Sequence, residues 1–126
     1  PDQEIWLDGG HNPHAARAIA RQLNNMPGRT ALVAAMLASK DATGYFMPFR
    51  QVRPEVFTLP NAPGHQGAEP QALAEAATNA GLKAAACDSL EAALKAAAAT
   101  GVDRILICGS LYLAGEVLAQ NGEPPV

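Results

Sequence analysis

The chain has 126 residues, of which 48% are apolar, and its formal net charge is −3. This size and composition are typical of one globular domain and exclude a disordered or fibrous chain. No apolar stretch is long enough to span a bilayer, and the scattered Lys and Arg of this net acidic chain disfavour a nucleic-acid surface.

Strand and helix patterns alternate along the chain, and the helical patterns end at Gly, Pro or Asn. Asn12 and Pro13 are typical of a helix start, Asp41 and Asp88 are predicted to cap later helices, and Pro48 should break or kink the second helix. In chain order, the pattern predicts a strand at 4–8, a helix from 13, a strand at 30–36, a helix at 42–49, a strand at 54–59, a loop at 60–70, a helix at 70–80, a strand at 83–87, a helix from 88 to Gly101, a strand at 104–108 and a helix at 111–120.

The alternation predicts a three-layer α/β fold with a mainly parallel, doubly wound, Rossmann-like sheet. The whole chain, residues 1–126, is predicted to be a single domain, because no linker interrupts it. A strand begins almost directly after Pro1, so we expect the domain to belong to a longer protein. Cys87 and Cys108 lie in apolar runs and are predicted to be buried, reduced thiols of a cytosolic protein.

Three polar turns follow predicted strands, at residues 8–11, 39–41 and 109–110. In a parallel sheet such turns share the edge at the carboxyl ends of the strands, where ligands bind. Asp8 is suited to a ribose hydroxyl, an amine or a metal-bound water, and His11 to a charged substrate. Lys40 can neutralise a carboxylate or phosphate, and Ser110 begins a helix as an anion pocket would.

Each of these residues also has a purely structural interpretation. Asp8 and Ser110 can cap the helices that follow them, His11 can be a loop histidine, and Lys40 an exposed lysine. Tyr112 can line the same pocket or simply pack. Phosphate-loop, dinucleotide-binding, zinc-type and nucleophile-elbow motifs are absent from the sequence, so no residue is assigned to a metal.

Three segments resemble folylpolyglutamate synthase and dihydrofolate synthase, a branch of the Mur ligase superfamily. They are residues 7–15 (LDGGHNPHA), 36–41 (MLASKD) and 107–116 (ICGSLYLAGE), and they occur in the family's order. The family usually has alanine at the position of Gly10. The loop at 60–70 matches no family pattern.

The resemblance implies the C-terminal domain of a ligase that uses ATP and Mg²⁺ to convert a carboxylate into an acyl phosphate, which the glutamate amine then attacks. It implies catalytic roles for Asp8 and His11, and nucleotide contacts for Asp8 and Asn12. Lys40, Ser110 and Tyr112 would bind glutamate. ATP and Mg²⁺ would be held mainly by a central ATPase domain, so the chain alone is expected to be inactive.

The implied partners are that N-terminal ATPase domain, glutamate, and folate or dihydropteroate. We expect a cytoplasmic monomer that binds neither nucleic acid nor a membrane. Three alternatives remain open from the sequence: a stand-alone anion- or nucleotide-binding module, a protein-interaction domain, and a cell-wall Mur ligase domain. An interaction domain would expose apolar side chains such as Trp6, Phe46 and Phe49, whereas His11 favours the folate branch over the cell-wall branch.

Overall fold

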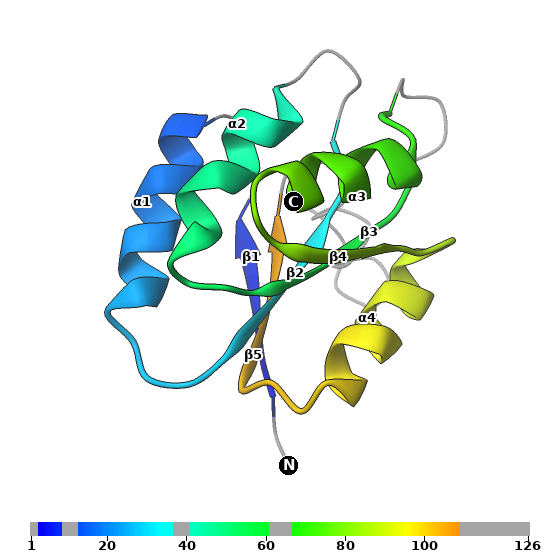
Figure 1. Cartoon of the computed structure of the whole chain (residues 1–126). Helices are drawn as coiled ribbons and strands as arrows, with labels where there is room; N and C mark the ends of the chain where they lie inside the picture. The colour runs from blue at the N-terminus through cyan, green and yellow to red at the C-terminus, as the bar shows by residue number, and fades with distance from the viewer. Residues whose placement is uncertain (1–2, 9–12, 37–40, 61–66, 109–126) are drawn as a thin grey trace, which may run out of the picture.

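A computed structural model describes residues 3–8, 13–36, 41–60 and 67–108 of the chain. Five parallel strands form one sheet in the order β1-β5-β2-β3-β4, as Figure 1 shows. The strands are β1 (Glu4–Asp8), β2 (Thr30–Ala34), β3 (Glu55–Thr58), β4 (Lys83–Ala86) and β5 (Arg104–Cys108). The predicted α/β fold with a doubly wound parallel sheet is confirmed.

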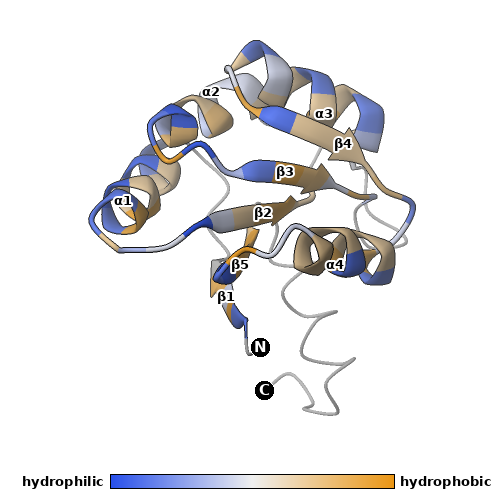
Figure 2. Cartoon of the chain, turned by 60° about the horizontal axis from the view of Figure 1, so that its bottom comes forward, coloured by the Kyte–Doolittle hydropathy of each residue, from blue (hydrophilic) through white to orange (hydrophobic). Residues whose placement is uncertain are grey.

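Helices cover both faces of the sheet, which lies between them in Figure 2. One face packs against α1 (Pro13–Asn24), α2 (Ala42–Phe46), the 3₁₀ turn η1 (Met47–Arg50) and α3 (Pro70–Asn79). The other face packs against α4 (Leu90–Ala99). Because both faces are covered, all five residues of β2 and all five of β5 are buried. Burial on both faces explains why β2 and β5 consist largely of consecutive apolar residues.

The second helix is shorter than the 42–49 prediction. It ends at Phe46, and residues 47–50 continue as the 3₁₀ turn η1, with Pro48 in its first positions. Proline lacks the N–H that an α-helix interior needs, so the series of α-helical hydrogen bonds ends before Pro48. Asp41 caps α2 as predicted, because its carboxylate Oδ1 accepts the Gly44 N–H at 2.9 Å.

Two further predictions need correction. Ser89, and not Asp88, caps α4: the Ser89 hydroxyl accepts the Ala92 N–H at 3.1 Å. Ser89 has the extended backbone of a cap residue directly before the first helical turn, which leaves Asp88 one position too early.

The two cysteines differ in burial. Cys108 is buried as expected, whereas Cys87 is only partly buried, because it follows the edge strand β4, whose residues are mostly exposed.

Candidate functional site

The candidate site is the edge of the sheet at which the strands end. The parallel register aligns the last residues of three neighbouring strands, so that Asp8 of β1 pairs with Cys108 of β5 and Cys108 with Ala34 of β2. Thr58, the last residue of β3, pairs with Ala34 in turn. The turns predicted to carry chemistry therefore leave the sheet from adjacent strand ends, which point upward in Figure 1.

Backbone bonds beyond the strands extend this edge. The Ala35 N–H donates to the Cys108 carbonyl at 3.4 Å, and the Ala68 N–H donates to the Met36 carbonyl at 2.9 Å. Ala35 and Met36 are fully buried, so the path of the chain out of β2 is fixed up to residue 36. On the far side of the next turn, the carboxylate of Asp41 is held by its cap bond, and a Cβ at Gly44 would displace that carboxylate from its present position.

Most of the predicted site residues lie outside the described ranges. They are His11, Asn12, Lys40, Ser110 and Tyr112, together with the glycines at 9, 10 and 109. Asp8 is described through its backbone, as the last residue of β1. Their predicted roles stay predictions, while the strands that lead into their turns are adjacent and in register.

A buried threonine at this edge, Thr58, is not among the site residues predicted from the sequence. Thr58 is fully buried, and its hydroxyl donates to the Pro70 carbonyl at 2.6 Å. This bond joins the end of β3 to the first residue of α3 and fixes the entry of that helix. The available signal was one polar side chain among the apolar residues 56–59.

Cys87 lies close to the same edge, one residue after β4. Its N–H donates to the Thr58 carbonyl at 2.7 Å. Partial burial and then the neighbouring Asp88 carboxylate raise the pKa of the Cys87 thiol above its ordinary value. The thiol is therefore less nucleophilic near neutral pH than a free cysteine, which does not favour a role in covalent catalysis.

The protein-interaction alternative is not supported by its marker residues. Phe46 and Phe49 are fully buried, and their rings lie 5.6 and 5.9 Å from the Tyr45 ring. Trp6 is half-buried, and the Arg104 guanidinium lies over its ring, with the guanidinium carbon 5.9 Å from the ring centroid. These aromatics build the core and do not form an exposed docking patch.

The basic residues are not scattered as the sequence suggested. Six of the nine Lys and Arg of the chain line two adjoining grooves. The grooves lie beside the edge of the sheet at which the strands begin, opposite the edge at which the strands end and the candidate site lies. The six basic residues are Arg17, Arg21, Arg29, Arg50, Arg53 and Lys83. Spacing along the sequence hid this clustering, because the six residues come from four separate segments.

Within the described ranges, no three His, Cys, Asp or Glu side chains are grouped in a way that could hold a metal ion. In the same part of the chain, no helix is long and apolar enough to cross a membrane.

Comparisons with known proteins place this fold in a family. Residues 2–111 match the family model described as "Mur ligase, glutamate ligase domain". The chain is 30% identical over 116 residues to the dihydrofolate synthase/folylpolyglutamate synthase of Escherichia coli (strain K12), a match that covers 90% of this chain and 27% of that protein.

Solved structures agree with that match. Folylpolyglutamate synthase of Mycobacterium tuberculosis, complexed with ADP and AMPPCP, superposes with a TM-score of 0.87 at 24% identity, over 97% of this chain and 30% of that one. E. coli FolC in complex with DHPP and ADP gives a TM-score of 0.80 at 27% identity, over 94% of this chain and 28% of that one. The chain thus spans less than a third of the length of these relatives, and it belongs to the family of Mur ligase glutamate ligase domains.

Proposed function

We propose that this chain is the glutamate-binding domain of an ATP-dependent amide ligase that adds glutamate to folate or dihydropteroate. The observation that carries the proposal is the aligned ends of β1, β5 and β2, from which the three family-like segments leave the sheet. The 30% identity to an E. coli dihydrofolate synthase/folylpolyglutamate synthase supports the folate branch. The cytoplasm is the proposed location.

ATP and Mg²⁺ are assigned mainly to a separate ATPase domain. The described residues offer no cluster of carboxylates for a metal, so we assign none of them as a magnesium ligand. When bound, ATP supplies the phosphoryl group that activates the substrate carboxylate. The present chain, without that domain, is proposed to be inactive.

In this proposal the turn residues bind and orient glutamate. Lys40, Ser110 and Tyr112 hold its carboxylates, because an amino acid with two carboxylates needs cationic and hydrogen-bonding partners. Asp8 and Asn12 contact the nucleotide, and Asp8 and His11 lie at the reacting groups. The amine nitrogen forms a bond to the acyl carbon, the carbon–oxygen bond to phosphate breaks, and the amine releases its proton.

The test uses the enzyme that contains this chain together with its ATPase domain. Lys40→Ala is expected to raise the KM for glutamate about tenfold or more, the loss of one charge-assisted contact, while the KM for ATP stays near its original value. Lys95→Ala is the matched control, because Lys95 is an exposed lysine of α4 that pairs with Glu91 at 3.2 Å.

Two results would contradict the proposal. An unchanged glutamate KM in Lys40→Ala would remove Lys40 from the glutamate site. Turnover of glutamate, ATP and dihydropteroate by the purified 126-residue chain would show that no second domain is needed.

A further inference from the structure

A second region of the molecule concentrates positive charge. The first of the two basic grooves lies between α1 and η1 and has a volume of about 830 Å³. Among the residues that the structure describes, four arginines line it, from α1 and from the segment that leads into β3, and no carboxylate does. They are Arg17, Arg21, Arg50 and Arg53.

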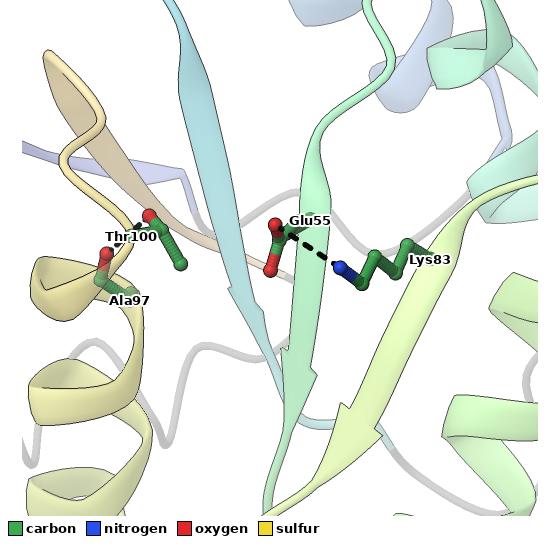
Figure 3. Close-up of polar contacts among 4 residues, drawn as sticks. All are labelled: Glu55, Lys83, Ala97 and Thr100. Atoms are coloured by element: carbon green, nitrogen blue, oxygen red, sulfur yellow. Dashed lines mark hydrogen bonds and ion pairs between the residues drawn. The ribbon is translucent and has the colours of Figure 1, made fainter.

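The second groove adjoins the first and extends the charge toward the starts of β3 and β4. It has a volume of about 540 Å³ and shares Arg50 and Arg53 with the first groove. The one carboxylate among its described lining residues, Glu55, lies 3.8 Å from the ammonium of Lys83 and is partly neutralised by it (Figure 3). The shared arginines therefore remain available to an anion from outside.

The arginines of the first groove form no ion pair among the described residues, in which the ion pairs are Lys83–Glu55 and Lys95–Glu91. Arg17 and Arg21 are one helical turn apart on the exposed face of α1, where like charges destabilise a helix by a few tenths of a kcal/mol. Uncompensated positive charge of this kind in a chain of net charge −3 indicates a site built for an anion.

The backbone conformation at Arg53 also supports an anion site in these grooves. Arg53 has φ of +54°, a left-handed conformation that non-glycine residues rarely adopt, and it directly precedes Pro54. Its N–H donates to the Phe49 carbonyl at 3.0 Å, which closes the turn. Asparagine or glycine would fit this turn with less strain, so the arginine is not explained by the needs of the turn.

We propose that the two grooves bind a small, extended polyanion that carries several carboxylate or phosphate groups. Guanidinium groups bind both kinds of oxyanion through paired hydrogen bonds, and four of them along one groove favour a ligand with several charges over a single anion. The grooves lie beside the starts of the strands, whereas the candidate glutamate site lies at their ends. The inference therefore does not depend on the proposed function.

The experiment is isothermal titration calorimetry of the 126-residue chain at low salt with two probes, inorganic tripolyphosphate and γ-linked tetraglutamate. We expect saturable binding of at least one probe, which weakens as salt is raised. Binding of tetraglutamate alone would define a carboxylate site, and binding of tripolyphosphate alone a phosphate site; both outcomes support a polyanion groove. Glutamate itself should bind much more weakly.

The decisive variant is Arg50→Gln, because Arg50 lines both grooves. It is expected to weaken binding about tenfold, the loss of one charge-assisted contact. Lys95→Gln removes the same charge from α4 and should change the affinity less than about twofold. Circular dichroism and thermal unfolding of both variants confirm that the exposed substitutions leave the fold intact.

Three results would overturn the inference. The first is the absence of saturable binding at millimolar concentrations of both probes. The second is a loss of affinity in Lys95→Gln as large as that in Arg50→Gln. The third is tight binding of a single-stranded oligonucleotide when neither small probe binds. The last result, if Arg50→Gln abolished it, would assign the grooves to nucleic acid.

Discussion

The turn before β2 offers a quantitative test of how the two central strands are held together. Gly28 has φ of +94°, and a Cβ built on it would lie 2.7 Å from Oδ2 of Asp103. That carboxylate oxygen accepts the Arg29 N–H at 2.8 Å, and the Asp103 N–H donates to the Arg29 carbonyl at 3.0 Å. The residues before β2 and β5 are thus joined by a pair of hydrogen bonds, and a Cβ at position 28 would displace the Asp103 carboxylate that makes one of them.

We expect Gly28→Ala to lower the free energy of unfolding by about 2–3 kcal/mol. Roughly 1 kcal/mol comes from placing an alanine in the left-handed region. A further 1–2 kcal/mol, at the low end because Asp103 and Arg29 are exposed, comes from displacing the carboxylate and losing its bond to the Arg29 N–H. Denaturant unfolding, followed by the fluorescence of the single tryptophan, measures the change.

Gly101→Ala is the matched control. Gly101 also has positive φ, +76°, but beyond its chain neighbours no atom of the described residues lies within 4 Å of the position a Cβ would take, so only the strain of about 1 kcal/mol is expected. In an Asp103→Ala background, Gly28→Ala should likewise cost only about 1 kcal/mol, because the oxygen that the methyl group displaces is gone. Equal costs for Gly28→Ala and Gly101→Ala in the original chain would refute the reasoning.

Three further predictions concern the core, a helix cap and a thiol. Phe49→Ala should cost about 3–5 kcal/mol in denaturant unfolding, because the ring is fully buried, whereas Met47→Ala, at a position 48% exposed, should cost less than about 1 kcal/mol. Ser89→Ala should cost about 1 kcal/mol by loss of the α4 cap, and a larger cost for Asp88→Ala would reverse the cap assignment. The pH midpoint of Cys87 alkylation, followed by peptide mapping, should lie higher in the folded than in the denatured chain, because burial and Asp88 raise the pKa of the thiol; coincident midpoints would contradict this.

Local patterns were sufficient to predict most of the fold. The apolar run at 30–36 predicted a strand; β2 covers Thr30–Ala34, and residues 31–36 are all buried. The helix predicted at 70–80 corresponds to α3 (Pro70–Asn79), whose Leu73 and Ala77 lie at helical spacing and are buried. The exchange of Asp88 for Ser89 as the cap could not be predicted, because both residue types cap helices and only the backbone conformation decides between them.

The sequence was enough to predict which strand ends lie side by side, whereas the predicted site residues, apart from the backbone of Asp8, lie outside the described ranges and stay predictions. Parallel alternation was enough to bring the turns after three strands to one edge, and the register at Cys108 agrees. The basic grooves were not predictable, because Arg21 and Arg53 come together through the packing of α1 against η1, which no local pattern encodes. The hydrogen bond of Thr58 also depends on tertiary packing, between β3 and α3.

The position of β5 has a consequence for how the chain is made. This strand is the last of the five in sequence, yet it sits between the first two, with Ile105 paired to Ile5 on one side and to Ala31 on the other. During synthesis, β1 has no neighbour to pair with until the ribosome has passed residue 108. A nascent or prematurely terminated chain that lacks β5 therefore leaves β1 without a partner and one edge of β2 open, and unpaired strands of this kind can pair with other chains.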